Sequence, residues 1–224
     1  MSINAKREIK CPGCSTVSDM TLWQSITADD SPDLKDDLLK GRINIFRCTA
    51  CSQVALVPEP MLYTDAKRKL MISFSPCERE SRNALFEKVK ETSRSSGELD
   101  NLDGYNLRFV TEYNELLEKI LIFDNDLNDK VIEVIKLLVL MQEEAKMDNR
   151  VCIFGKCADG FIEFMVQDKK EEQIYTSRVP MLTYETISKS LTESGVKFKS
   201  FNWEMVDAEY ASRLLRGANN TLGM

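Results

Sequence analysis

Two pairs of cysteines near the N-terminus constrain this chain more than any other feature. The first pair, Cys11 and Cys14, lies in the segment IKCPGC, and the second pair, Cys48 and Cys51, lies in RCTAC. Each two-residue spacer allows a tight turn in which two thiolates converge on one tetrahedral centre, and two such turns supply four sulfur ligands to a zinc ion. The spacing therefore predicts a four-cysteine metal site.

Three other interpretations of these cysteines stay open at this point. A thioredoxin-like redox centre needs one CxxC pair at the start of a helix and has no use for a second pair. An iron ion accepts the same four-sulfur geometry as zinc. The thiols could also be buried without a ligand. Since the chain contains no histidine, mixed cysteine and histidine sites are excluded.

A four-thiolate zinc site would be structural. Four protein ligands fill the tetrahedral coordination of zinc and leave no position for water or a substrate. In small modules such sites contribute roughly 10 kcal/mol or more of apparent folding free energy. We therefore expect one structural zinc ion per chain, with Cys11, Cys14, Cys48 and Cys51 as its ligands. The remaining cysteines, Cys77, Cys152 and Cys157, are expected to be buried or half-buried thiols.

The long gap between the two pairs predicts a helical insertion. Residues 31 to 41 start with Ser31 as an N-cap and Pro32 at the first helical position, and they end at Gly41. Strand-forming residues, interrupted by prolines, occupy three later segments, 42 to 48, 52 to 65 and 69 to 76. The N-terminal region is thus expected to be a zinc-ribbon-like antiparallel sheet with a helical insertion.

Three further helical segments are predicted after this sheet. Residues 76 to 104 start as a helix and end in a flexible connector rich in Ser, Gly and Asp. Residues 107 to 123 carry apolar side chains at helical spacing, and residues 128 to 146 are apolar almost all round. We expect an antiparallel helical hairpin on the sheet. Its apolar second helix is expected to lie in a core or to provide a surface for a partner or a second copy.

The C-terminal part changes pattern. Residues 151 to 180 alternate between strands and turns, and they are followed by a helix over residues 183 to 195 and a strand over residues 197 to 206. A final helix is expected to be capped by Asp207 and to end at Gly217.

The predicted fold class is therefore α+β, with the four-cysteine ribbon sheet, the helical hairpin and a C-terminal α+β portion in that order. The predicted domains are residues 1–148 and residues 149–224. The second either stands alone or completes the sheet of the first.

Four segments match one family pattern. They are CPGC, NIFRCTAC, EPMLYTDAKRKLMISFSP and LRFVTEYNELLEKILIFDNDLNDKVIEVIK, and they extend over roughly residues 9 to 137. This combination resembles the bacterial CpXC family, which is named for its paired cysteine motifs. The resemblance implies that both cysteine pairs are metal ligands, and it brings no catalytic residues. Isolated CxxC pairs occur in many unrelated proteins, so the specificity comes from both pairs together with the helical segment.

Composition bears on compartment and partners. The polar N-terminus lacks the pattern of a secretory signal, and the longest apolar run, residues 131 to 141, is too short to span a membrane. Seven cysteines fit poorly with a fully paired extracellular framework. A cytoplasmic protein outside the membrane is expected. The net charge of −6 does not favour nucleic acid, although Lys67, Arg68 and Lys69 form a basic cluster that leaves such contact open.

The two predicted helices of the hairpin carry several acidic side chains, Glu115, Glu118, Asp129 and Glu133. Carboxylates on facing helices suggest acid and base catalysis if their environments separate their pKa values. Ion pairing on solvated faces, for instance Glu115 with Lys119 or Glu133 with Lys136, is the favoured interpretation.

No familiar catalytic motif accompanies the metal site. A glycine-rich phosphate loop, a GxSxG elbow and an HExxH helix are all missing from the sequence. We therefore expect a structural-zinc protein that is a protein-binding or scaffold module, with a protein partner or self-association, and not an enzyme. Two alternatives remain. One is an enzyme of unrecognised type in a cleft between ribbon and helices, and the other is a redox sensor in which thiol oxidation ejects the zinc.

Overall fold

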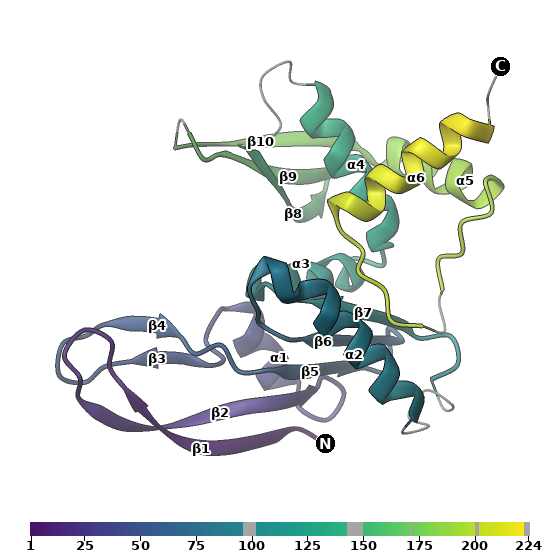
Figure 1. Cartoon of the computed structure of the whole chain (residues 1–224). Coiled ribbons are helices and arrows are strands. Elements are labelled where there is room, and N and C mark those ends of the chain that lie inside the picture. Colours follow the sequence, from purple (N-terminus) through teal and green to yellow (C-terminus); the bar gives the residue numbers. More distant parts are fainter. Residues whose placement is uncertain (96–101, 143–149, 171, 200–201, 222–224) are drawn as a thin grey trace. The chain divides into compact units, whose positions relative to one another are not determined.

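The structure is a computed structural model that describes residues 1–95, 102–142, 150–170, 172–199 and 202–221 (Figure 1). Its packing divides the chain into two compact units. Unit 1 comprises Met1–Leu117 with Phe201–Trp203, and unit 2 comprises Glu118–Ser200 with Glu204–Met224. The fold is α+β with the four cysteines in the N-terminal region, which confirms the predicted fold class. The sequence predicts two domains that meet after residue 148 and fold independently. Packing alone does not show independent folding, so this division stays a prediction.

Unit 1 is built on a five-stranded sheet. Its strands, in spatial order, are β1 (Ile3–Lys10), β2 (Val17–Thr27), β5 (Met61–Asp65), β6 (Leu70–Phe74) and β7 (Asn106–Val110). Strand β2 runs antiparallel to β1, and β6 runs antiparallel to β5. The pairs β2–β5 and β6–β7 are parallel, so the sheet is mixed. Each parallel pair needs a crossover, because a tight turn joins only antiparallel strands.

The two crossovers carry the other elements of unit 1. From β6 to β7 the chain passes through the 3-10 helix η1 (Arg79–Ser81) and helix α2 (Arg82–Ser95). From β2 to β5 it passes through helix α1 (Pro32–Leu39) and a separate hairpin of β3 (Ile45–Arg47) and β4 (Val54–Leu56). The second cysteine pair lies in the β3–β4 turn, so this crossover brings it beside the first pair in the β1–β2 turn.

The inserted helix forms as predicted. Helix α1 has Ser31 at its N-cap and Pro32 in its first turn, although the Ser31 side chain makes no capping hydrogen bond. The chain leaves the helix through Gly41, whose φ of 64° favours glycine. Strands β3 to β6 also lie within the segments that were predicted to be strands.

Three strands of the five-stranded sheet were not predicted. Most side chains of β1 are exposed, and β2 has only Leu22 and Ile26 buried, so a regular alternation of apolar and polar residues is missing from both strands. Strand β7 corrects the helix predicted over residues 107 to 123. All five of its residues are buried beside the parallel strand β6, and helix α3 (Tyr113–Asp124) starts only afterwards. Strands buried on both faces read as apolar runs and resemble helices in sequence.

A buried asparagine attaches the β3–β4 hairpin to strand β2. The Asn44 side chain accepts a hydrogen bond from Trp23 N at 2.8 Å and donates one to Trp23 O at 2.9 Å, as a neighbouring strand would. Its backbone has a φ of 56°, in the left-handed region that asparagine tolerates better than most residues.

We expect Asn44→Ala to destabilise unit 1 by about 2 kcal/mol, because it leaves both Trp23 groups unpaired and places alanine in a left-handed conformation. Urea unfolding followed by tryptophan fluorescence measures this loss. Asn4→Ala, on an exposed position of β1, is the matched control and should change the free energy by less than about 0.5 kcal/mol. Equal stability of the two variants would contradict this role of Asn44.

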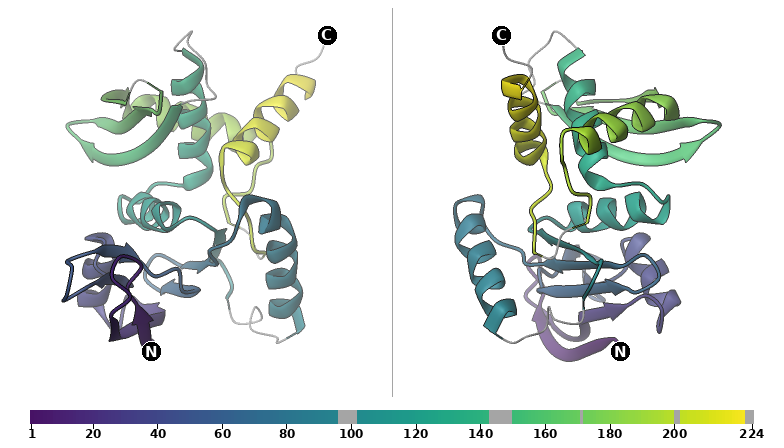
Figure 2. Two further views of the ribbon diagram at one scale, coloured as in Figure 1. Left: turned by 60° about the vertical axis from the view of Figure 1, so that its left-hand side comes forward. Right: turned by 90° about the vertical axis from the view of Figure 1, so that its right-hand side faces the viewer.

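Unit 2 combines helices with a second sheet. Beyond the rest of α3 it contains α4 (Asp129–Gln142), β8 (Arg150–Ala158), β9 (Phe161–Asp168), β10 (Gln173–Pro180), α5 (Met181–Glu193) and α6 (Ala208–Thr221). The three strands form an antiparallel sheet of their own, in the order β10-β9-β8. Helix α4 contacts β8, α5 and α6, and so lies at the centre of this unit (Figure 2).

The apolar residues of helix α4 fill the core of unit 2. Six of its side chains are buried together with Phe154, Phe164 and Leu191 from the sheet and α5; they are Val131, Ile132, Val134, Ile135, Leu137 and Val139. The prediction of a core helix is thus confirmed. The alternative, that this helix provides a surface for a partner, is wrong for these side chains because their own unit covers them.

The C-terminal predictions are partly confirmed. The three strands and helix α5 form as expected, and Asp207 Oδ1 caps α6 by accepting a hydrogen bond from Tyr210 N at 2.8 Å. Helix α6 continues past Gly217, so the predicted stop there is wrong. The strand predicted over residues 197 to 206 is also wrong in its described residues. Instead, Trp203 is buried in unit 1 and donates a hydrogen bond to Ser93 Oγ at 2.9 Å.

Two predicted segments reach beyond the described residues. The helix expected at the start of residues 76 to 104 is α2, whereas its connector falls largely on residues 96 to 101, which lie outside the described residues. Likewise, the helix predicted over residues 128 to 146 is confirmed through Gln142, and its last residues lie outside the described part.

Candidate metal centre

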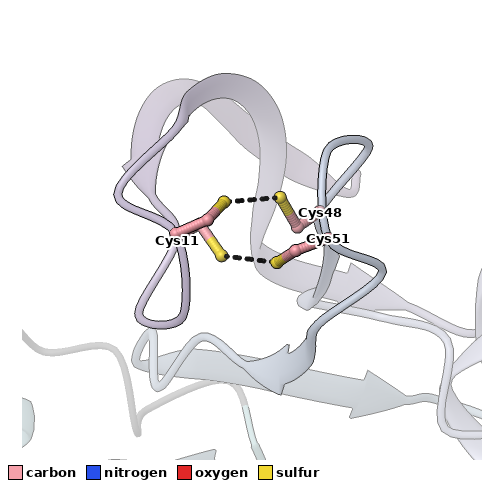
Figure 3. Close-up of side chains that lie close together, drawn as sticks. Cys11, Cys48 and Cys51 are labelled. Atoms are coloured by element: carbon pink, nitrogen blue, oxygen red, sulfur yellow. Dashed lines mark hydrogen bonds between the residues drawn. The ribbon is translucent and has the colours of Figure 1, made fainter.

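The four cysteines predicted to bind a metal lie together in the structure. Cys11 and Cys14 lie in the turn between β1 and β2, and Cys48 and Cys51 lie in the turn between β3 and β4. Figure 3 shows Cys11 facing Cys48 and Cys51 across the two turns. Their Sγ atoms all lie within 4.8 Å of one another. Two hairpin tips, separated by a helix in sequence, thus direct four sulfurs to one point.

Both turns have the same backbone structure. In the first, Cys11 N donates to Thr16 O and Ser15 N donates to Cys11 O, each at 2.9 Å. In the second, the equivalent bonds run from Cys48 N to Gln53 O at 2.8 Å and from Ser52 N to Cys48 O at 3.0 Å. The serine after each pair has a left-handed backbone, with φ of 62° at Ser15 and 59° at Ser52. The shared sequence Cys-x-x-Cys-Ser therefore folds into two equivalent knuckles.

A glycine allows the knuckles to approach closely. A Cβ atom at Gly13 would lie 3.3 Å from Gln53 Oε1 and 3.6 Å from Cys51 Sγ, so a larger residue would press on the opposite knuckle. Beneath the sulfurs, Phe46 is buried between the hairpins, and Ile9, Met20 and Val57 pack around it. This small apolar core holds the two hairpins together below the cysteine cluster.

Exposure differs between the cysteines of each pair. The first cysteine of each knuckle is buried, with 1% of Cys11 and 2% of Cys48 exposed, whereas Cys14 and Cys51 are exposed. Two sulfur contacts join different knuckles. Cys11 Sγ lies 3.6 Å from Cys51 Sγ, and Cys14 Sγ lies 3.5 Å from Cys48 Sγ.

The four thiols do not ionise independently. The hydroxyl of Thr16, 3.2 Å from Cys14 Sγ, and the Thr16 backbone lower the pKa of Cys14 to about 6. The Gln53 backbone also favours the ionised form of Cys51, but the neighbouring sulfurs of Cys14 and Cys11 and partial burial together outweigh it and raise the pKa of Cys51 to about 12. Since adjacent negative charges disfavour one another, full ionisation of the cluster requires a cation among the sulfurs.

The donor set suits a soft metal ion. Four thiolates converging on one point are the ligands of tetrahedral zinc and iron sites, and hard cations such as magnesium prefer oxygen. Cys11, Cys14, Cys48 and Cys51 could therefore hold one metal ion. Such an ion would supply the positive charge that lets all four thiols ionise, and it would join the tips of the two hairpins.

The acidic residues of the predicted hairpin occupy two different environments. Glu115 caps the start of α3, where its Oε2 accepts hydrogen bonds from Thr111 N at 3.2 Å and Glu112 N at 3.4 Å. Its other oxygen lies 3.4 Å from Arg82 NH2. The pairing predicted with Lys119 is replaced by these contacts, because the Lys119 side chain is buried elsewhere.

The other three carboxylates belong to a buried network of five charges in unit 2, formed by Glu118, Lys119, Asp129, Glu133 and Lys136. Lys119 Nζ lies 3.3 Å from Asp129 Oδ2 and 3.0 Å from Glu133 Oε1. Lys136 Nζ lies 2.9 Å from Glu118 Oε2 and 3.1 Å from Glu133 Oε1. The predicted Glu133–Lys136 pair is confirmed, but the prediction of solvated faces is wrong.

Mutual attraction favours the charged forms of Lys119 and Glu133 in this network. Burial opposes the charge of Lys119, but Glu133 and Asp129 outweigh burial and raise the pKa of Lys119. Burial likewise opposes the charge of Glu133, and Lys119 and Lys136 together hold the pKa of Glu133 below its ordinary value. Glu118 Oε1 also accepts a hydrogen bond from Phe154 N at 2.6 Å, which ties helix α3 to strand β8.

The remaining cysteines and the basic cluster are placed as expected. Cys152 is buried, and Cys77 and Cys157 are half-buried. Lys67, Arg68 and Lys69 form the turn between β5 and β6, where Lys67 and Lys69 are exposed. Within the part of the chain that the structure describes, no helix has the length and apolar character needed to cross a membrane.

Two hairpins that present four cysteines to one point define a ribbon-type, four-cysteine protein. Comparison with protein families identifies the group more closely: the model described as CpXC protein matches residues 9–136. This range includes both knuckles and more than half of the 224 residues, so the chain belongs to the CpXC family, and the resemblance seen in the sequence is confirmed. Comparison with curated proteins gave no match, and comparison with solved structures gave none either.

Proposed function

We propose that the four cysteines bind one structural zinc ion and that the ribbon they stabilise is a protein-binding module. The convergence of four Sγ atoms within 4.8 Å carries the proposal. Zinc is favoured over iron because a closed four-thiolate centre needs no redox activity to hold two hairpins together. Four reduced thiols also fit a reducing compartment such as the cytoplasm.

The outer face of the β3–β4 hairpin supports a binding role. Val54 and Leu56 are 46% and 39% exposed and alternate along β4, so they lie on one face. Arg47, directly opposite Val54 on β3, is exposed on the same face. No carboxylate occurs between residues 41 and 58. This face therefore suits a protein partner that offers apolar side chains beside an acidic one.

The experiment combines metal content with partner capture. Elemental analysis by mass spectrometry of the purified protein should give about one zinc per chain. The double variant V54S/L56S should keep the zinc and the fold but lose a protein that co-purifies with the wild type. Ile174→Ser is the matched control, since Ile174 is 66% exposed on a strand of unit 2, and it should retain that protein.

The two measurements test separate parts of the proposal. Iron in place of zinc, or protein without metal, would contradict the structural zinc ion. Retention of the same partner by V54S/L56S, or no co-purifying protein with the wild type, would contradict the assignment of the binding face.

A further inference from the structure

Two sulfur contacts of the metal centre run between the hairpins. Cys14 Sγ lies 3.5 Å from Cys48 Sγ, and Cys11 Sγ lies 3.6 Å from Cys51 Sγ (Figure 3). Each of these contacts joins a sulfur on the β1–β2 turn to one on the β3–β4 turn. A disulfide formed along either contact would therefore cross-link the two hairpins, whereas a disulfide within one CxxC pair would not.

Each of these contacts also combines one accessible thiol with one protected thiol. Cys14 is exposed and Cys48 is buried; in the other contact Cys51 is exposed and Cys11 is buried. A dissolved oxidant reaches the exposed sulfur first, and a buried resolving thiol on the opposite hairpin then lies 3.5 or 3.6 Å away. Accessible thiols beside a resolving cysteine are typical of redox-sensitive sites.

We infer that the centre is a peroxide-sensitive switch whose oxidised form holds two cross-hairpin disulfides, Cys14–Cys48 and Cys11–Cys51, in place of the metal ion. This inference rests on the proposed zinc site for the reduced form and adds its regulation. It also specifies which disulfides form. The two CxxC motifs alone would suggest disulfides within each pair, Cys11–Cys14 and Cys48–Cys51.

The chemistry needs one peroxide molecule for each disulfide. The Cys14 thiolate attacks a peroxide oxygen, so a sulfur–oxygen bond forms, the oxygen–oxygen bond breaks and hydroxide leaves. The Cys48 thiolate then attacks the Cys14 sulfur, so a disulfide forms and a second hydroxide leaves. The two sulfurs lose two electrons and the peroxide gains them. The Cys51 and Cys11 thiolates react in the same way, and the metal ion departs because no thiolate remains to bind it.

The cross-links change what metal loss does to the ribbon. Without metal or disulfide, the hairpins keep the small apolar core around Phe46 and the hydrogen bonds of Asn44 to Trp23 but lose the connection at the cysteine cluster. Two cross-hairpin disulfides replace the metal as a covalent connection and restrict the unfolded chain. The oxidised ribbon therefore stays folded after zinc release. Oxidation converts a folded, zinc-bound ribbon into a folded, disulfide-linked ribbon.

Tryptic digestion separates disulfides within one hairpin from disulfides between the hairpins, and fragmentation of the joined peptides in the mass spectrometer distinguishes Cys14–Cys48 from Cys14–Cys51. Trypsin cleaves after Lys10 and Arg47, which directly precede Cys11 and Cys48, and also at Lys35 between the two pairs. Each CxxC pair thus falls on its own peptide. Zinc-loaded full-length protein is treated with hydrogen peroxide while a chromogenic chelator records zinc release; free thiols are then alkylated, and the digest is examined by mass spectrometry without reduction.

We expect one zinc ion released for every two disulfides and the two cysteine peptides joined in one species. The metal-free oxidised protein should also unfold about 5 °C or more above the metal-free reduced protein. Cys77→Ser, which removes a half-buried thiol outside the centre, should give the same disulfide-linked peptides as the wild type.

Separate peptides with internal Cys11–Cys14 and Cys48–Cys51 disulfides would overturn the inference, as would zinc release without any disulfide. The disulfide pattern can also be determined after peroxide treatment of protein that starts reduced and free of metal. A failure of zinc binding is therefore distinguishable from a failure of the cross-hairpin pairing.

Discussion

Replacing Cys48 with serine is expected to abolish tight zinc binding and to unfold the ribbon of unit 1. Cys48 is 2% exposed and packs with Cys11 and Phe46 in the core between the hairpins, so water cannot readily take the place of its sulfur. Structural zinc sites contribute on the order of 10 kcal/mol of apparent folding free energy in small modules, and much of this stabilisation should disappear. Elemental analysis measures the metal, and hydrogen exchange of strands β1 to β4 measures the local unfolding.

Two variants make this result specific. Cys77→Ser removes a half-buried thiol outside the cluster and should keep about one zinc per chain with native exchange rates. Cys51→Ser removes an exposed ligand, where water can complete the coordination, and should weaken zinc binding less than Cys48→Ser does. Full zinc occupancy in Cys48→Ser would show that this cysteine is not a ligand.

The cysteine cluster was predictable because the turns that form it are local. Each CxxC spacer encodes a knuckle, and four thiols of this type have few other uses in one short region. The crossover helix between the pairs was also predictable, since Pro32 and Gly41 mark its two ends. What the pattern could not supply is the pairing of sulfurs, because the contacts between Cys14 and Cys48 and between Cys11 and Cys51 depend on how two separate hairpins meet.

The missed strands share one physical cause. Sequence patterns report the contrast between a buried face and an exposed face, and neither β1 nor β7 has that contrast. Most side chains of β1 are exposed, and every residue of β7 is buried, including Arg108. The buried charges of helices α3 and α4 were misread for a related reason: a charged residue at helical spacing looks solvated unless its partner on another helix is known.

Lys119→Met should be the most destabilising single substitution outside the ribbon. The change keeps a long unbranched side chain but removes the cation that lies within 3.3 Å of both buried carboxylates, Asp129 and Glu133, although Glu133 keeps its contact with Lys136. Removing one partner of a buried ion pair costs about 3 to 5 kcal/mol, because the remaining charge is uncompensated. Urea unfolding of unit 2, followed by circular dichroism, measures the loss. Lys189→Met on α5 is the matched control: Lys189 is 78% exposed, and the change should cost less than about 1 kcal/mol.

The pH dependence separates lost charge pairing from lost packing. The lysines hold the pKa of Glu133 below its ordinary value of 4.5, so in the wild type its contribution to stability is present above pH 4.5 and is lost as pH falls through the lowered pKa. The raised pKa of Lys119 gives a contribution that is present below pH 10.5 and is lost as pH rises through the raised value. In Lys119→Met, Glu133 keeps Lys136 but loses Lys119, so the pKa of Glu133 is lowered less than in the wild type. The difference in stability between variant and wild type should therefore shrink as pH falls from 7 towards 4. A difference that stays constant over this range would mean that Lys119 stabilises unit 2 through packing alone.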